Sequence, residues 1–155
     1  MYLDDHTGTI KGNTIIGSGA ADTYGIYNAS ANETTWQITY NVFDSLDYAY
    51  HNNDGTNGDS LFNNVFYKIY SRVVNNGVAG FMNNIVYIES DSLNVYLDAH
   101  TVDTADFNVY NKEQADMFGS GNDDLASISP FETNSVVGDP SFTDAPGGDF
   151  HTESG

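Results

Sequence analysis

The sequence predicts an all-β solenoid, a chain that winds in stacked coils and pairs each short strand with its equivalent one coil away. Three observations predict this fold. Asn and Gly are abundant, a short motif recurs with a period near 23 residues, and residues 36–111 lack the apolar spacing of an amphipathic helix. We therefore expect a single domain over residues 1–155, with about five coils: regular coils over 13–110 and an irregular closing segment over 111–155.

The polarity of the chain comes from uncharged residues. Its 155 residues include 18 Asn and 15 Gly, whereas charged residues make up only 17%. Helix-rich proteins take their polarity from Glu, Lys and Arg, while Asn and Gly favour turns and left-handed backbone positions. The composition therefore predicts many short strands separated by many turns.

Two interleaved motifs share one period. An Asn followed by two apolar residues recurs 23, 20 and 24 residues apart, at Asn41, Asn64, Asn84 and Asn108. A second series recurs 24, 24 and 22 residues apart, at Asn28, Asn52, Asn76 and Asp98. An earlier copy begins at Asn13, and we expect residues 28–35 to form the extra loop that separates it from Asn41.

A constant period predicts coils of 20–25 residues with two or three strands each. Equivalent strands would lie about 4.8 Å apart, so like side chains stack into rows. Asn suits the bends because it tolerates left-handed backbone and its amide can bond to the amide one coil away. An antiparallel sandwich, the alternative fold, predicts alternating strands but no such period.

The closing segment interrupts the period. Asn111 with Gln114 has the spacing of a helix N-terminus, and Gly119 would end the helix. We expect one short helix near residues 112–118 that covers one open end of the solenoid. The N-terminal end shows no comparable cap, so end-to-end association into a homo-oligomer or filament is a further expectation.

Parts of the sequence resemble the right-handed parallel β-helix (pectin-lyase-like) superfamily. The resemblance is carried by residues 61–66 and 81–86, each of which consists of an apolar pair, Asn-Asn and a second apolar pair. Residues 138–151 resemble the stretch that closes many bacterial domains of this kind. Ser141 and Thr152 stand where that stretch usually has apolar residues, and its Ser-Pro-Ala is absent. We therefore expect the C-terminal part of such a domain, as a fragment or with a degenerate closing turn.

The resemblance implies polysaccharide lyases as one functional class. Lyases of this fold abstract a proton with Lys or Arg, usually with Ca²⁺ on the substrate carboxylate. Lys68 and Arg72 lie four residues apart beside tyrosines and are the weak catalytic candidates among only four basic residues. A solvated basic pair is the favoured interpretation, since the acidic surroundings would raise the pKa of a lysine.

Hydrolases of this fold instead use clustered carboxylates. The acidic pairs in this sequence are Asp44 with Asp47, Asp54 with Asp59, and Asp123 with Asp124. The motifs of polygalacturonase-type enzymes are missing, and the four histidines, at positions 6, 51, 100 and 151, lie in unrelated contexts. A catalytic carboxylate pair is therefore the less favoured interpretation.

One loop has the oxygen-rich pattern of a Ca²⁺ site. Residues 51–59 alternate Asn, Asp and Gly, and Asp54, Asn57 and Asp59 are the candidate ligands. The loop lacks the bidentate Glu of an EF-hand, and an ordinary polar bend is the favoured alternative. Ca²⁺ is the one cofactor that the sequence indicates.

Tyrosines recur along the predicted coils. If they face outward on one sheet they form a platform for sugar rings, and if they face inward they fill the core. A register slip of one residue inverts the answer, so both alternatives stay open. Tyr67, Tyr70 and Tyr87 are the candidate ligand-binding residues.

Net charge and residue usage exclude several classes. The formal charge is −18, with 22 acidic residues and 4 Lys plus Arg, so non-specific nucleic-acid binding is excluded. The absence of cysteine excludes a disulfide scaffold, and no apolar run is long enough for membrane insertion.

The function expected is that of a non-catalytic extracellular or cell-surface module. It would present an acidic, Asn- and Tyr-rich face to a glycan or another protein. The alternative is a pectin- or alginate-type lyase or hydrolase that acts on an acidic polysaccharide.

Overall fold

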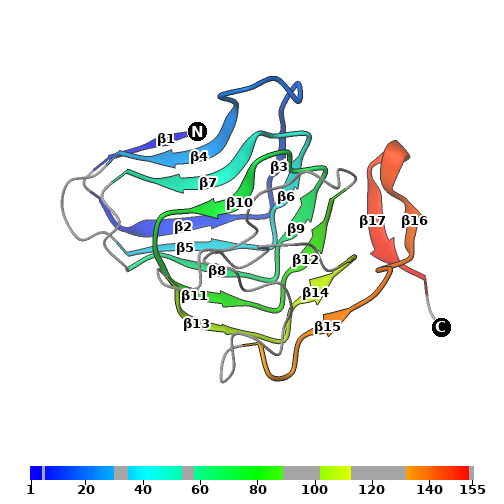
Figure 1. Cartoon of the computed structure of the whole chain (residues 1–155). Coiled ribbons are helices and arrows are strands. Elements are labelled where there is room, and N and C mark those ends of the chain that lie inside the picture. Colours follow the sequence, from blue (N-terminus) through cyan, green and yellow to red (C-terminus); the bar gives the residue numbers. More distant parts are fainter. Residues whose placement is uncertain (5, 30–34, 54–57, 89–101, 113–131, 154–155) are drawn as a thin grey trace.

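The chain is a parallel β-solenoid (Figure 1). The computed structural model describes residues 1–4, 6–29, 35–53, 58–88, 102–112 and 132–153. Three parallel sheets surround one interior, and each coil visits them in the order A, B, C.

The strands of the three sheets have the following bounds. Sheet A contains β1 (Tyr2–Leu3), β4 (Tyr24–Asn28), β7 (Tyr48–Asn52) and β10 (Arg72–Asn75). Sheet B contains β2 (Gly8–Lys11), β5 (Trp36–Thr39), β8 (Ser60–Phe62), β11 (Val78–Met82) and β13 (Val102–Asp106). Sheet C contains β3 (Thr14–Ile16), β6 (Val42–Asp44), β9 (Val65–Tyr67), β12 (Ile85–Tyr87), β14 (Val109–Tyr110) and β15 (Val136–Val137).

The predicted period is confirmed by the strand register. Asn28 pairs with Asn52 in sheet A, and Val42, Val65 and Ile85 follow one another in sheet C. The number of coils is slightly lower than the five expected, because a strand in all three sheets occurs in about four turns of the described chain. The motif copy at Asp98 lies outside the described residues.

The insertion that lengthens the interval from Asn13 to Asn41 does not lie in the predicted connection. The connection over 29–35 is as long as its equivalent over 53–59. The connection over 17–23, from sheet C to sheet A, has seven residues, whereas its equivalent over 45–47 has three. Composition misplaced the insertion because residues 28–35 are polar, and polarity marks any exposed connection.

A ladder of asparagines joins the coils at the corner between sheets B and C. It is formed by Asn13, Asn41, Asn64, Asn84 and Asn108. In each step the Oδ1 of one Asn accepts the backbone N–H (2.9–3.0 Å) and the Nδ2 (3.0–3.2 Å) of the Asn one coil earlier. The Nδ2 of Asn64 also donates to the carbonyl of Ile38 at 2.8 Å. The last four ladder residues are buried, so their amides satisfy corner groups that water cannot reach.

The corner is sharp because the residue before each ladder Asn has left-handed backbone. These residues, with φ between 55° and 70°, are Gly12, Tyr40, Asn63, Asn83 and Phe107. Gly and Asn adopt this conformation readily, whereas Tyr and Phe adopt it rarely. The stacked corner therefore imposes the backbone on Tyr40 and Phe107, whose side chains are exposed.

Apolar rows fill the interior between the three sheets. Phe43 and Phe66 occupy equivalent positions in sheet C, and Phe81 packs on Phe66 from sheet B. All three are fully buried, with centroid distances of 5.0 and 5.6 Å. Ile38 and Leu61 occupy equivalent positions in sheet B and are also fully buried. Stacked equivalent side chains thus form one continuous core.

The described closing residues extend sheet C and then leave it. β15 pairs with β14, and after it β16 (Phe142–Asp144) and β17 (Asp149–Thr152) form an antiparallel hairpin around a short 3-10 turn, η2 (Ala145–Gly147). Figure 1 shows this hairpin beside sheet C. The predicted helix over 112–118 lies outside the described residues apart from Lys112, which is not helical, and the boundary at residue 111 stays a prediction.

We expect Asn64→Ala to lower the free energy of unfolding by about 2–4 kcal/mol, since it leaves buried backbone groups of Asn41 and Ile38 without partners. Urea denaturation measures the change. The matched control is Asn63→Gly, which keeps the left-handed corner but lies outside the ladder and should change stability by less than about 1 kcal/mol. Equal effects of the two substitutions would show that the ladder contributes nothing specific.

Candidate functional site

The C-terminal hairpin covers part of the outer face of sheet C. Its Phe150 ring lies 5.2 Å from the ring of Tyr67, and its Phe142 ring lies 6.1 Å from both Tyr67 and Tyr87. As a result, Tyr67 points outward from the solenoid but is only 6% exposed. The hairpin leaves one hollow on each of its sides.

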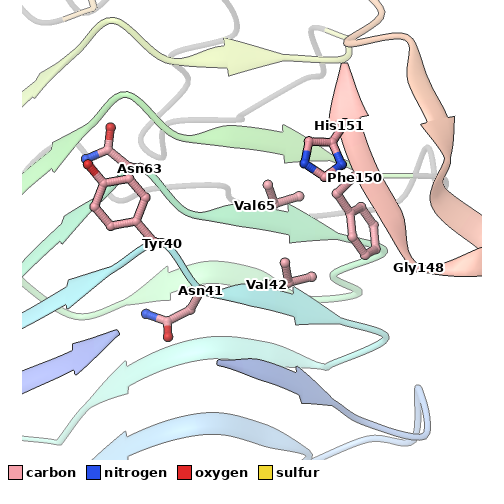
Figure 2. A pocket seen from close by; sticks show the side chains of 8 residues that line it. All are labelled: Tyr40, Asn41, Val42, Asn63, Val65, Gly148, Phe150 and His151. Carbon is pink, nitrogen blue, oxygen red and sulfur yellow. The ribbon is translucent and has the colours of Figure 1, made fainter. Parts of the chain in front are cut away.

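The first hollow, here the hairpin groove, has a volume of about 290 Å³ and lies between sheet C and β17 (Figure 2). It is lined by Tyr40, Asn41, Val42, Asn63, Val65, Gly148, Phe150 and His151. In Figure 2, Val42 and Val65 lie between the Tyr40 corner on one side and Phe150 and His151 on the other. The groove therefore combines an aliphatic floor with aromatic walls.

Polar groups border the hairpin groove. The Nδ1 of His151 lies 2.6 Å from an Oδ1 of Asp149, and the backbone N–H of His151 donates to the same oxygen. These two bonds lower the pKa of Asp149, and the backbone bond has the larger effect. With Nδ1 in contact with Asp149, the Nε2 of His151 is left for another hydrogen bond. At the corner, Lys11 lies over the ring of exposed Tyr40, 5.1 Å from its centroid.

The second hollow lies on the other side of the hairpin and has a volume of about 330 Å³. It is lined by Tyr67, Tyr87, Asp139, Ser141, Phe142, Thr143, Asp144, Ala145 and Pro146. Asp139 and Asp144 accept backbone N–H groups of Ser141 and Gly147, so their carboxylates organise the hairpin itself.

The three candidate tyrosines do not form one platform. Tyr67 and Tyr87 are neighbours with centroids 5.1 Å apart and both line the second hollow. Tyr70 lies on the connection from β9 to β10, is 39% exposed, and packs against Gly19. Their role in ligand binding stays a prediction.

The two catalytic candidates, Lys68 at the start of the connection from β9 to β10 and Arg72 just after its end, make separate contacts. Lys68 has left-handed backbone and its Nζ lies over the ring of Tyr67, 5.2 Å from the centroid. Arg72 begins β10, and its Nη1 donates to the Oδ1 of Asn75 at 2.7 Å on sheet A. Each of the two side chains therefore contacts a different partner, Tyr67 for Lys68 and Asn75 for Arg72.

The candidate Ca²⁺ loop is described only at its ends. Asp54 and Asn57 lie outside the described residues. Asp59 is fully buried and accepts hydrogen bonds from Asn28 Nδ2 and the backbone N–H of Trp36, both at 2.7 Å, and from the hydroxyl of Tyr50. Its carboxylate therefore faces the interior, where burial and Asp59 raise the pKa of Tyr50.

Other acidic and histidine candidates are also dispersed. Asp47 is nearly buried and accepts the N–H of Asp22 and the hydroxyl of Ser71, whereas Asp44 accepts the hydroxyl of Ser45. Asp123, Asp124 and His100 lie outside the described residues. Within the described ranges, no three His, Cys, Asp or Glu side chains are grouped to hold a metal ion. The same ranges contain no helix long and apolar enough to cross a membrane.

Sequence analysis missed the residues of the hairpin groove and an aromatic surface on sheet A. Tyr40 precedes a ladder Asn, and its exposure follows from its corner position. Phe150 and His151 reach sheet C only through the hairpin. On sheet A, Tyr24 stacks on Tyr48 because the two pair directly across strands. The 24-residue spacing of those two tyrosines was the available signal.

A buried carboxylate ends the Asn ladder. Glu132 is 2% exposed and accepts bonds from Asn108 Nδ2 at 3.0 Å, from the Tyr110 hydroxyl at 2.6 Å, and from the Ser135 hydroxyl. Burial raises the pKa of Glu132 above the usual value of a glutamate, although these three bonds act in the opposite direction. Burying the ionised carboxylate therefore reduces the free energy of unfolding.

Comparison with known proteins assigns no family. No protein-family model, no curated protein and no solved structure matches this chain.

We expect Phe150→Ala to loosen the hairpin, because the ring packs against both Tyr67 and Phe142. Hydrogen exchange should become at least tenfold faster for amides of β16 and β17, while β9 amides stay protected. Phe107→Ala, at an exposed corner away from the hairpin groove, is the control. Unchanged hairpin exchange would contradict the proposed packing.

We expect Glu132→Gln to flatten the pH dependence of stability. The folded protein binds the Glu132 proton more tightly than the unfolded chain, so this group makes stability fall as pH rises above the ordinary glutamate pKa. Urea denaturation at pH 4.5 to 7 should show that the variant loses less stability over this interval than the unsubstituted protein. If the free energy of unfolding changed with pH by the same amount in both proteins, this contribution of Glu132 would be ruled out.

Proposed function

We propose that this chain is a non-catalytic module that binds a glycan chain in the hairpin groove. The observation that carries the proposal is the composition of that groove, in which Val42 and Val65 lie between Tyr40 and Phe150. Ligand sites are concave, mostly apolar surfaces with a few placed polar groups. The groove has both components and a volume close to the lower limit for such sites.

A sugar ring matches these two components. Its C–H bonds form apolar faces, which pack against aliphatic side chains and against the electron-rich faces of aromatic rings. Its hydroxyl groups need hydrogen-bond partners at the rim, which the amide of Asn63 and the imidazole of His151 supply. The Asp149 contact orients the imidazole, so its Nε2 is held in position before a ligand arrives.

The floor of the groove belongs to a longer row on sheet C, which supports an extended ligand. The row consists of Thr14, Val42, Val65, Ile85, Val109 and Val136 in direct register. Its members are half-buried or exposed and lie about 4.8 Å apart along the stack. Such a straight row favours a linear chain that runs along the solenoid over a single sugar.

We also infer membership of the pectin-lyase-like superfamily and a place outside the cell or on its surface. Support for the superfamily comes from three parallel sheets, stacked Asn corners and the closing phrase over 138–151. Support for the location comes from a chain with 22 acidic residues, four basic residues and no cysteine. An experimental structure of a confirmed relative that superimposes on these coils would test the membership.

Affinity electrophoresis tests the glycan proposal with soluble xylan, mixed-linkage β-glucan and polygalacturonate plus Ca²⁺ as the probes. We expect at least one neutral polymer to retard the protein, and Tyr40→Asn to weaken the retardation about tenfold. That substitution copies the Asn of the equivalent corners at Asn63 and Asn83, so it preserves the fold.

The matched control is Phe107→Asn, which changes an equivalent corner outside the groove and should bind normally. Retardation by none of the three polymers, or equal losses in both variants, would overturn the proposal. Release of unsaturated sugars from polygalacturonate, detected in the ultraviolet and lost in Lys68→Ala, would establish the lyase alternative instead.

A further inference from the structure

The outer face of sheet A carries two columns of rings, which we call the sheet A aromatic face. One column contains Tyr24 and Tyr48, stacked at 5.1 Å. The other contains Tyr2, Tyr27 and His51, stacked at 5.7 and 4.8 Å. The columns meet nearly at right angles, with 86° between the rings of Tyr24 and Tyr27.

Some polar groups of this face are already hydrogen-bonded within the protein. The Nδ1 of His51 lies 2.6 Å from the Nδ2 of Asn75, whose Oδ1 accepts from Arg72, and the hydroxyl of Tyr27 donates to Asn53. Burial, followed by the nearby Arg72, lowers the pKa of His51, so the imidazole is neutral at pH 7. A partner can therefore cover the imidazole of His51, the amide of Asn75 and the hydroxyl of Tyr27 without leaving them unpaired.

Acidic side chains border this face but do not stand on its strands. Burial first, and then the nearby Asp22 and Asp47, raise the pKa of Tyr24. The chain has 22 acidic residues, yet the outward positions of β1, β4, β7 and β10 hold none. These positions are Tyr2, Tyr24, Tyr27, Tyr48, His51, Arg72 and Asn75. Protein interfaces are depleted of acidic residues and enriched in Tyr and Arg, which is the composition found here.

We propose that the sheet A aromatic face binds the same face of a second copy of this chain in a two-fold dimer. Two chains that each carry −18 approach most closely where acidic side chains are fewest, and the outward strand positions of this face hold none. Sheets pack face to face about 10 Å apart, so the rings of one copy lie between those of the other. This dimer is independent of the glycan proposal.

The size of the face sets the strength of the dimer. Four strands about 4.8 Å apart and two to five residues long form a small surface, below the roughly 800 Å² per partner of a standard interface. The dimer should therefore be weak and should form as concentration rises. Added salt should strengthen it, because salt screens repulsion between the two acidic chains.

Analytical ultracentrifugation tests the proposal over a concentration series up to about 1 mM, in low salt and in 0.5 M NaCl. We expect a monomer–dimer equilibrium that shifts toward dimer in salt, and at least a tenfold weaker association for Tyr48→Asp. Phe107→Asp adds the same charge at an exposed corner and should leave the equilibrium unchanged. Circular dichroism confirms that both variants are folded.

A second measurement remains informative if Tyr48→Asp fails to fold. The chain has no cysteine, so Tyr48→Cys and Phe107→Cys each carry one thiol. A short bismaleimide should link Tyr48→Cys into dimers at high protein concentration and leave Phe107→Cys monomeric. A monomer at every concentration, equal crosslinking of the two variants, or association lost in Ile16→Asp at the β3 edge instead would overturn the proposal.

Discussion

The corner between sheets B and C is the constraint on which the structure depends. A chain that turns sharply at the same place in every coil leaves backbone groups inside the turn, where water cannot reach them. A stacked Asn satisfies groups of the preceding coil through Oδ1 and Nδ2 together, and its Nδ2 also donates to the Asn of the next coil. The period of the sequence is therefore the period at which this amide must recur.

The ladder also gives the solenoid two different ends. In each step the earlier Asn donates to the later one, so a hydrogen-bond acceptor is needed after Asn108. Glu132 and Ser135 provide it, with oxygens that accept the Nδ2 and the N–H of Asn108. At the other end, the Oδ1 of Asn13 accepts no hydrogen bond within the described residues.

The same stacking determines the character of the outer faces. Because equivalent positions lie in register, one outward residue type repeated along the chain becomes a column. On sheet A this produces stacked aromatic rings, with no acidic residue at the outward strand positions, and on sheet C a row of β-branched residues. The hairpin then divides the outer face of sheet C, which places the proposed ligand groove beside a surface that the chain covers itself.

The sequence by itself determined the solenoid, its period and the Asn ladder, because these depend on regularly spaced residues that contact their own equivalents. It did not determine which tyrosines are accessible: Tyr50 lies in the core, Tyr67 lies beneath the hairpin, and Tyr40 is exposed at a corner. Those outcomes depend on the two-residue period of side-chain direction and on a hairpin whose partner is about 80 residues earlier in the chain. Asp59 shows the same limit, since a loop rich in Asn and Gly resembled an ion site until the tertiary structure placed its carboxylate inside, between Asn28 and Tyr50. Only packing between distant segments decides whether a polar side chain faces a ligand or the core.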